Sequence, residues 1–263
     1  SLSLYEESSL KLYVMKPLVS IVIPTYENFD GLLRALESVY SQTYEFYEVI
    51  IINDGSSDKR YLEYKFKQGT KLISLTKNSV EEKGYFSDSI RNKGINIASG
   101  KYIAFLDDDD YWLKDKLEKQ INILESTENS MTCTEAYASH GLFQKNKPGQ
   151  LYIGELNYKE VSKIYKNSGS KWDFTLNKYY FKFHIPSIWN LKFISIHNCI
   201  ITSSVVVEKS LIDKIGGFRE IPDKKRYSDW DCWIGLLTHT DCVYIKEPLL
   251  HYNLSPGLNV NPT

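Results

Sequence analysis

The chain has 263 residues, of which 42% are hydrophobic and 25% are charged, and its formal net charge is −1. These values are ordinary for one large globular domain, and the balanced charge offers no basic surface for nucleic acid or anionic lipid. No apolar run approaches the roughly 20 residues that span a bilayer. We therefore expect no nucleic-acid partner and no transmembrane segment.

The cysteines indicate a reducing compartment. The chain has four of them, which lack the close pairing of a zinc site and are too sparse for a disulfide scaffold. Buried free thiols fit this pattern, so we expect a cytoplasmic protein. The chain begins at Ser1, and a leader or anchor removed ahead of this residue is left open.

Strands and helices alternate through the first half of the chain. Residues 1–16 are polar and predict an arm or a short helix. Short apolar runs then predict buried strands over 18–23, 49–52, 72–75 and 102–106. Apolar side chains at helical spacing predict helices around 32–40, 61–66, 90–97 and 113–124.

Three details of this pattern are specific expectations. We expect the first strand to stop over 24–26 (PTY), because proline cannot extend a central strand. Asn28 or Asp30 is the expected cap of the helix that follows, and Gly100 is expected to close the helix over 90–97. The alternation as a whole predicts a parallel sheet with helices on both faces.

The second half of the chain has a less regular pattern. Residues 139–198 are rich in Tyr, Phe, Lys and Asn and show no clean period, which predicts an irregular or mixed region built onto the same sheet. Order returns in four predicted elements: a strand over 200–207, a helix over 208–215 closed by Gly216 and Gly217, a helix from about Asp229, and a strand over 242–245 with loop from Pro248 onward.

An acidic run follows the fourth predicted strand directly. It consists of Asp107 to Asp110, four adjacent carboxylates that repel one another. Carboxylate oxygens are the ligands that Mg²⁺ and Mn²⁺ prefer, so a divalent cation would offset this repulsion. A solvated acidic turn is the alternative, and the run by itself does not decide between the two.

Polar loops also follow the first two predicted strands, at residues 24–27 and 53–58. The carboxyl ends of parallel strands share one edge of a sheet, and ligands bind at that edge in α/β proteins. Acids and an aromatic side chain from three loops therefore converge. If these loops were only solvated turns, their meeting at one edge of the sheet would be a coincidence of three separate segments.

These segments together resemble those of family 2 glycosyltransferases with the GT-A fold. The matching segments are 22–26 (VIPTY), 51–58 (IINDGSSD), 91–94 (RNKG), 98–110 (ASGKYIAFLDDDD), 215–218 (IGGF) and 228–233 (SDWDCW). The resemblance covers 17–125 closely and 200–240 more loosely. Each segment is short, but their order and spacing together are specific, and residues 131–198 match no pattern.

The resemblance implies an α/β, GT-A (Rossmann-like) fold, with a mostly parallel sheet flanked by helices and a mixed, irregular acceptor-side second half. We expect residues 1–263 to form a single domain. Its nucleotide-sugar-binding half would span 17–130, and its acceptor-binding half 131–263.

The resemblance also implies which residues contact the nucleotide. Thr25, Tyr26 and Glu27 would line the nucleobase pocket, with Tyr26 as a stacking face. Asp54 would accept a hydrogen bond from the imide N–H of the base, which favours uracil. A turn or helix cap is the alternative role of Asp54.

The helix of the RNKG segment would sit beside the nucleotide through Arg91 and Asn92. Gly94 would allow its close approach. Ordinary helix packing is the alternative for this segment.

Metal binding is assigned to the acidic run. Asp109 would bind Mn²⁺ or Mg²⁺ directly, and Asp107 is a second candidate ligand. Asp107 or Asp108 would hold the ribose or a metal-bound water, although the register within four adjacent acids could shift by one. Asp110 is expected to cap the next helix. His251 would follow the last strand and close over the diphosphate or the metal, with a surface-loop histidine as the alternative.

A late helix supplies the expected catalytic base. The family usually places Glu-Asp at its start, where this chain has Ser228 and Asp229. Asp229 would deprotonate the acceptor hydroxyl, with Asp231 as the alternative base and a helix cap as the alternative role. His197 and Asn198 could face the acceptor. Four tryptophans could stack on sugars, although core packing is the default for each: Trp172, Trp189, Trp230 and Trp233.

The predicted function is metal-dependent transfer of a sugar, with inversion, from a nucleoside-diphosphate sugar to a hydroxyl of a saccharide, protein or lipid acceptor. A UDP-sugar is the expected donor. A sugar nucleotidyltransferase would need a glycine-rich basic loop at residues 24–27, which this chain lacks. A phosphatase would carry its acids after the first strand. A catalytically inactive nucleotide-sugar-binding module is the third alternative. The replacement at Ser228 favours it, and the presence of Asp54, Asp109 and Asp229 argues against it.

Overall fold

The computed structural model describes residues 16–83, 88–141, 143–144, 147, 149–157, 185–195, 197–220 and 228–255. The arm or short helix predicted for 1–16 lies outside these residues except for Lys16, and Trp172 lies outside them as well. Among the described residues, no helix combines the length and the apolar character needed to cross a membrane.

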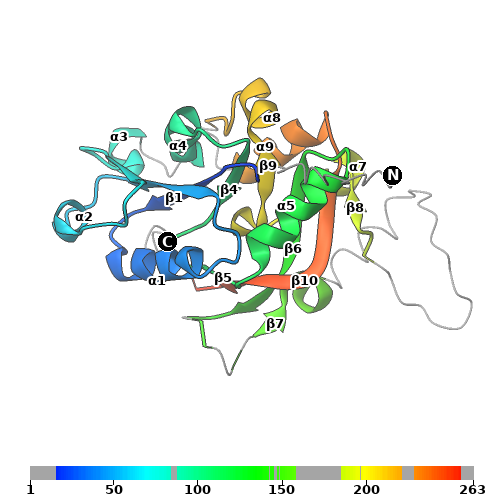
Figure 1. The fold of residues 1–263 in the computed structure, drawn as a ribbon, viewed down its shortest axis with the longest axis horizontal. Coiled ribbons are helices and arrows are strands. Elements are labelled where there is room, and N and C mark those ends of the chain that lie inside the picture. Colours follow the sequence, from blue (N-terminus) through cyan, green and yellow to red (C-terminus); the bar gives the residue numbers. More distant parts are fainter. Residues whose placement is uncertain are drawn as a thin grey trace, which may run out of the picture.

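A sheet forms the centre of the structure, and its first half is parallel (Figure 1). Its strands are β1 (Val19–Thr25), β2 (Tyr47–Asn53), β3 (Thr70–Ser74) and β4 (Tyr102–Phe105). β1 pairs in parallel with β2 on one side and with β4 on the other, and β2 pairs in parallel with β3. The four predicted strands are thus confirmed, and their carboxyl ends share one edge.

The first strand ends at Thr25, within the stop predicted over 24–26, although Pro24 itself lies inside the strand. The pairing of β1 with β4 stops at Val22, whose carbonyl accepts a hydrogen bond from the N–H of Leu106 at 3.1 Å. Backbone groups two residues apart point to the same side of a strand, so Pro24 faces the side on which β4 has ended. Its missing N–H therefore costs no ladder hydrogen bond.

Helices cover both faces of this sheet. One face packs against α1 (Phe29–Tyr40) and α5 (Lys116–Ser126), and the other against α4 (Arg91–Ile97) and α9 (Ser228–Leu237). Successive residues of a strand point to opposite faces, so Ile21 of β1 packs with the first pair of helices and Val22 with the second. The expected doubly covered sheet is confirmed.

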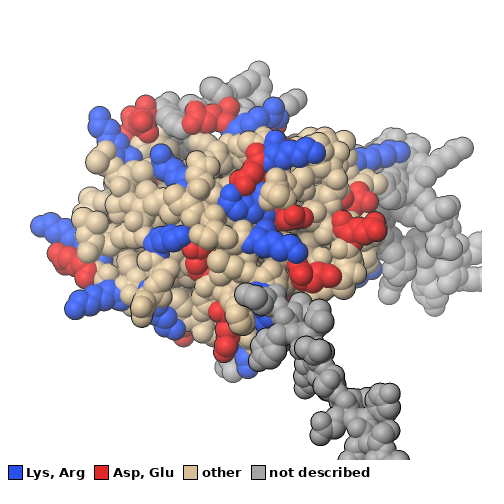
Figure 2. Space-filling view, turned by 45° about the horizontal axis from the view of Figure 1, so that its top comes forward, with Lys and Arg blue, Asp and Glu red and all other residues tan. Residues whose placement is uncertain are grey.

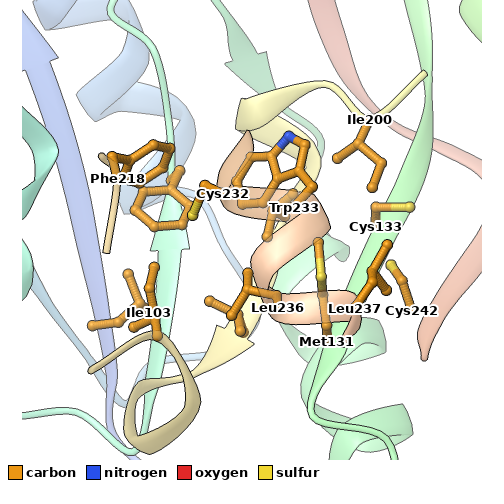
Figure 3. Close-up of a cluster of buried hydrophobic side chains, with 14 of the residues drawn as sticks. Ile103, Met131, Cys133, Ile200, Phe218, Cys232, Trp233, Leu236, Leu237 and Cys242 are labelled. Carbon is orange, nitrogen blue, oxygen red and sulfur yellow. The ribbon is translucent and has the colours of Figure 1, made fainter. Parts of the chain in front are cut away.

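A buried cluster fixes the position of α9 on the sheet. Trp233 and Leu236 of this helix lie with Phe218, Ile103 and Met131 in one apolar group (Figure 3). The rings of Phe218 and Trp233 meet edge to face, with their centroids 5.7 Å apart. The helix predicted from about Asp229 is therefore confirmed, and its packing places its first turn close to the edge where β1, β2 and β4 end.

Two predicted helices differ in their extent. The second helix, α2 (Arg60–Glu63), is one turn long, because the backbone becomes extended at Tyr64 and leaves Phe66 outside the helix. The next long helix, α4, ends before an extended Ala98, so Gly100 does not close it. Gly100 is needed instead for close packing, since a Cβ there would lie 2.7 Å from the backbone nitrogen of Ser20.

The second half of the chain extends the sheet with mixed strands. β9 (Val206–Glu208) runs antiparallel to both β4 and β6 (Met131–Ser139). β10 (Cys242–Asn253) is parallel to β6 and antiparallel to the short β5 (Tyr111–Trp112). The strand order is β3-β2-β1-β4-β9-β6-β10-β5. This is the expected mixed second half built onto the same sheet.

Smaller elements complete the described part of this half. β7 pairs with β6, and β8 pairs with β10. The bounds are β7 (Gln150–Leu151), the π-helical segment η2 (Tyr152–Asn157), β8 (Ile188–Trp189), α7 (Leu191–Ile194), the 3-10 turn η3 (Thr202–Ser204) and α8 (Lys209–Lys214). Gly216 and Gly217, at φ 81° and 72°, end α8 as predicted.

Two predictions of strand boundaries in this half are wrong. The strand expected over 200–207 is interrupted by η3, because Ser204 turns back and donates to the carbonyl of Ile201 through both its N–H and its hydroxyl. The last strand continues beyond Pro248 to Asn253. Register shifts on both sides of Pro248 accommodate the proline as a bulge, so the strand does not end there.

Candidate active site

A cleft of about 810 Å³ lies where β1, β2 and β4 end, beside the first turns of α4 and α9. Eight of the residues predicted for the site line this cleft: Thr25, Tyr26, Asp54, Arg91, Asp107, Asp108, Asp109 and Asp229. Three others do not: Glu27, Asn92 and His251. The structure therefore brings the acids of the second and third loops together with Thr25 and Tyr26 of the first loop and with the acid of the late helix.

The loop after β1 is tied to the loop after β2. The hydroxyl of Thr25 lies 2.8 Å from that of Tyr61. Glu27 has a positive φ of 49°, its N–H donates to Ser56 Oγ at 2.9 Å, and its Oε1 accepts from the N–H of Ser57 at 2.5 Å. The carboxylate of Glu27 thus joins the two loops, and this side chain does not face the predicted pocket.

Asp54 is buried and lines the cleft, but its carboxylate is already engaged. Its two oxygens accept from the N–H of Ser79 at 3.0 and 3.1 Å, and Oδ2 also accepts from the Ser79 hydroxyl at 2.8 Å. Ser79 begins the short helix α3 (Ser79–Lys83), which the sequence did not predict. The cap considered as an alternative role is therefore present, although it caps α3 and not the helix directly after the loop.

Arg91 is buried between two acids. Its guanidinium forms ion pairs with Asp88, in the 3-10 turn η1 (Asp88–Ile90), and with Asp107. Burial acts to lower the pKa of Arg91, but the charges of Asp107 and Asp88 hold it above its ordinary value. Arg91 thus orients Asp107 at the edge of the cleft.

Asn92 and Gly94 serve packing. Both amide atoms of Asn92 bind the backbone of Phe218, at 2.8 and 2.9 Å. A Cβ at Gly94 would lie 2.7 Å from Val22 and 2.9 Å from Ile52, so its close approach is to the sheet. The ordinary packing left open for this segment accounts for these two residues, while Arg91 faces the cleft.

The acidic run is a tight turn, in which the N–H of Asp110 donates to the carbonyl of Asp107 at 3.2 Å. Burial raises the pKa of Asp108 to about 6. Burial, reinforced by the charges of Asp107 and Asp108, raises the pKa of Asp109 to about 7. These half-buried carboxylates crowd one another, a condition that a cation would relieve.

The prediction that Asp110 caps the next helix is wrong, because α5 begins six residues later at Lys116. Its Oδ1 instead accepts from the N–H of Asn253 in β10 at 2.9 Å. Its buried Oδ2 has no hydrogen-bond partner among the described residues. Such an oxygen beside Asp109 is compatible with a bound cation or an ordered water nearby.

A divalent cation fits this carboxylate set. Among the described residues, no three His, Cys, Asp or Glu side chains come together as a ready metal site. Mg²⁺ in particular is commonly held by one or two carboxylates, with the remaining positions taken by water and substrate phosphates. Asp109 and Asp107 can supply that pair at the cleft.

His251 lies away from the cleft. It sits inside β10, where it is buried and its Nε2 lies 2.8 Å from Ser139 Oγ. Burial lowers its pKa. The sequence placed His251 after the last strand, but that strand continues past it. Tyr252 and Asn253, the next two residues, are the ones that line the cleft.

Asp229 lies in the first turn of α9 and lines the cleft. Its Oδ1 accepts from the N–H of Trp230 at 2.6 Å, and its Oδ2 accepts from Asn198 Nδ2 at 3.3 Å. Burial and then the charge of Asp88 raise its pKa to about 6, against the opposing effects of the Trp230 N–H, Arg91 and Asn198. The alternative base, Asp231, does not line the cleft, and its carboxylate binds Arg219.

The acceptor side contains residues that the sequence did not single out. Glu135 of β6 is buried, and its carboxylate accepts from the N–H groups of Ile153 and Gly154 at 2.9 and 2.8 Å. This fixes η2, whose first residue, Tyr152, lines the cleft. His197 and Asn198, which the sequence did offer for the acceptor side, also line the cleft. No sequence pattern marks Glu135, because its partners are backbone groups far along the chain.

The tryptophan candidates that the structure describes are either buried in the core or placed at the cleft. Trp189 and Trp233 are fully buried, in line with the core role expected by default. Trp230 lines the cleft, and its indole N–H donates to the carbonyl of Ile194 at 2.8 Å, which fixes the ring. Of the described candidates, Trp230 is the one placed to contact a ligand.

Comparison with known proteins gives the same picture. The profile of Glycosyl transferase family 2 matches residues 20–210. An uncharacterized glycosyltransferase of Rickettsia typhi is 30% identical over 96% of this chain and 69% of its own length. A UDP-Glc:alpha-D-GlcNAc-diphosphoundecaprenol beta-1,3-glucosyltransferase of Escherichia coli is 38% identical over 41% of this chain and 42% of its own. The chain spans only 19% of a Rickettsia bellii glycosyltransferase.

Solved structures share the fold. S. aureus TarS in complex with UDP-GlcNAc matches 92% of this chain and 60% of its own, with a TM-score of 0.63 and 14% identity. The mannosyltransferase PcManGT of Pyrobaculum calidifontis, in complex with GDP-Man and Mn²⁺, matches 94% of this chain and 59% of its own, with a TM-score of 0.61 and 14% identity. The sheet and its helices are those of GT-A glycosyltransferases, as expected. The chain belongs to glycosyl transferase family 2.

Proposed function

We propose that this glycosyltransferase is a metal-dependent, inverting enzyme that moves a sugar from a UDP-sugar to an acceptor hydroxyl. The observation that carries the proposal is one cleft lined by Asp107, Asp108 and Asp109 from one loop and by Asp229 from a helix more than 100 residues later. Acids with two different environments can take two different roles.

The donor would lie along the edge formed by β1, β2 and β4. Asp54 and Tyr26 line the part of the cleft that the family resemblance assigns to the base. The complexes of TarS with UDP and with UDP-GlcNAc support a uridine donor, because they show that this fold accommodates such a ligand. Ser79 holds the Asp54 carboxylate in a fixed position at this edge of the cleft.

Asp109, with Asp107, would hold Mn²⁺ or Mg²⁺. The Mn²⁺ in the PcManGT complex supports a divalent cation in this fold. A bound cation supplies Lewis-acid stabilisation of the negative charge that develops on the departing nucleoside diphosphate. Arg91 holds Asp107 in place through its ion pair.

Asp229 would act as the base. As the acceptor oxygen bonds to the anomeric carbon, the bond from that carbon to the diphosphate oxygen breaks, and the hydroxyl proton moves to the Asp229 carboxylate. A pKa of about 6 leaves this group ionised at neutral pH while it remains basic enough to take a proton. Attack on the face opposite the leaving group inverts the anomeric configuration.

We further propose that one domain carries both functions, with donor contacts in residues 17–130 and acceptor contacts in 131–263. Tyr152, His197 and Trp230 line the cleft from the second of these ranges. The E. coli relative acts on a diphosphoundecaprenol-linked sugar by its name. A saccharide on a lipid diphosphate is therefore one acceptor to include in any screen.

The test of the base is the substitution Asp229→Asn. The matched control is Asp231→Asn, two residues further along α9. General-base catalysis contributes about 10²- to 10⁴-fold, so Asp229→Asn should fold, bind UDP and lose transfer by at least about 100-fold. Asp231→Asn removes part of the contact with Arg219 and should keep transfer close to wild type. Turnover of Asp229→Asn equal to wild type would eliminate Asp229 as the base.

A further inference from the structure

Arg34 is a cation of the cleft that the proposed mechanism leaves unused. It lies on α1 and lines the cleft together with Arg91. Arg91 is neutralised by Asp88 and Asp107, whereas the described residues provide no ion pair or hydrogen bond for the Arg34 side chain. A partly exposed guanidinium in this situation is suited to a planar oxyanion such as phosphate.

The start of α1 places Arg34 beside the acidic run. Asn28, the cap of this helix, donates from Nδ2 to the backbone carbonyl of Asp108 at 3.4 Å. Gly31 lies so close to the same carbonyl that a Cβ would be 2.5 Å from it. Arg34 follows Gly31 by three residues and therefore occupies the same face of the helix, one turn further on.

Asn253 approaches the acidic run from the other flank. Its N–H donates to Asp110 Oδ1 at 2.9 Å. Its side-chain oxygen accepts from the N–H groups of Gly141 and Ser255, both at 3.0 Å. With the oxygen occupied in this way, the amide NH₂ is the end left for a ligand, and it can only donate. No described residue accepts from it, and Asn253 lines the cleft.

We propose that Arg34 and the Asn253 amide form a phosphate-binding rim on the two flanks of the acidic run. Six aspartates line the cleft, so a phosphate entering it needs a cation and neutral donors beside the carboxylates. The phosphate is either the diphosphate of the donor or a phosphate carried by the acceptor. The identity of the ligand rests on the proposed function, but the rim itself can be tested with inorganic pyrophosphate.

The first experiment uses Arg34→Gln, Arg34→Lys and the matched control Arg60→Gln. Arg60 is an exposed arginine held by Asp30 and Asp58 outside the cleft, so its loss changes the net charge equally. Calorimetric titrations with UDP, uridine and pyrophosphate are run with Mn²⁺ present. Charge-assisted hydrogen bonds are stronger than neutral ones. Arg34→Gln should therefore weaken pyrophosphate and UDP binding by about tenfold or more. Arg34→Lys should recover part of this loss, and Arg60→Gln should match wild type.

The second variant, Asn253→Asp, keeps the accepting oxygen and replaces the NH₂ donor with a second oxygen. It should also weaken phosphate binding, because it puts an acceptor where a donor is needed. Uridine, which has no phosphate, should bind Arg34→Gln as it binds wild type. Urea unfolding midpoints establish that each variant is folded before it is titrated.

A further pair of probes identifies the source of the phosphate: N-acetylglucosamine 1-phosphate and N-acetylglucosamine. A loss in Arg34→Gln that is confined to the sugar phosphate, with UDP unaffected, assigns the rim to the acceptor. Equal affinity of wild type and Arg34→Gln for UDP, pyrophosphate and the sugar phosphate overturns the proposal. If pyrophosphate binding depends on Arg34 in a protein that binds no nucleotide, the rim stands and the proposed function fails.

Discussion

Asp229 has the protonation behaviour expected of a base that works near neutral pH. Its pKa is raised to about 6, chiefly because the carboxylate is buried, and the base must be ionised to accept a proton. We therefore expect kcat/KM to fall about tenfold per pH unit below pH 6. An unperturbed aspartate would keep its activity down to about pH 4. The measurement is a pH profile at saturating Mn²⁺.

Removal of the hydrogen bond from Asn198 to Asp229 should shift the pH profile of kcat/KM. The hydrogen bond from Asn198 lowers the pKa of Asp229, so Asn198→Ala should shift the acid limb to higher pH. The matched control is Asn122→Ala, an exposed position on α5 that does not line the cleft. A limb that stays in place, or that moves to lower pH, would contradict the assignment of the limb to Asp229.

At the residue scale, the sequence revealed groups whose chemistry is visible from their neighbours alone. Four adjacent acids after an apolar strand indicated a site, and the structure places three of them in the cleft. Glu27 and Asn92 could not be assigned in this way, because their partners, Ser57 and Phe218, are set by tertiary contacts. The role of Glu135 could not be predicted either, because its partners, the N–H groups of Ile153 and Gly154, are also set by tertiary contacts.

At the scale of elements, apolar runs predicted the buried parallel strands well and the mixed half poorly. β6 is buried along most of its length, yet its sequence, MTCTEAYAS, alternates small and polar residues and carries no strong signal. The sequence predicts loop from Pro248 onward, whereas β10 continues to Asn253. A bulge that tolerates proline depends on the partner strand, which a local pattern does not reveal. His251 was misplaced as a direct consequence of this error.

The contact between α4 and the sheet gives a test at the same scale. A Cβ at Gly94 would lie 2.7 Å from Val22 Cγ1 and 2.9 Å from Ile52 Cδ1, both buried. Gly94→Ala should therefore lower the free energy of unfolding by about 1–3 kcal/mol through overpacking. Urea unfolding measures this change.

Gly235 in α9 is the matched control for this substitution. A Cβ there would come no closer than 3.3 Å to another heavy atom, Cδ1 at the far end of the Ile215 side chain. Gly235→Ala should leave stability unchanged or raise it by up to about 1 kcal/mol, because alanine favours the helix. Equal destabilisation of the two variants would refute the close packing of α4 as the reason for Gly94.

At the scale of the whole molecule, both halves of the chain build one continuous sheet, and the cleft takes residues from both. The face in Figure 2 carries basic and acidic side chains side by side, as the near-zero net charge predicts. The fold class followed from the sequence because alternation and order of elements are local signals. The arrangement of β9, β6 and β10 did not follow, since it depends on pairing between distant segments.

Ligand binding should stabilise the molecule as a whole. UDP with Mn²⁺ at about 100 times its Kd should raise the free energy of unfolding by about 2.7 kcal/mol, and the melting temperature by about 5 °C. Asp109→Ala should abolish the part of this shift that depends on Mn²⁺. The exposed Asp241→Ala, outside the cleft, is the control and should keep the full shift. A shift with another nucleotide but none with UDP would contradict the uridine donor.

The most direct measurement of the central claim is a donor screen followed by product analysis. UDP-sugars and other nucleotide sugars are incubated with Mn²⁺ and a panel of saccharide acceptors, and release of the nucleoside diphosphate and the anomeric configuration of the product are recorded by NMR. We predict UDP release that requires the metal, and a product with the anomeric configuration opposite to that of the donor. Retention of configuration, or equal transfer in the presence of a chelator, would contradict the account.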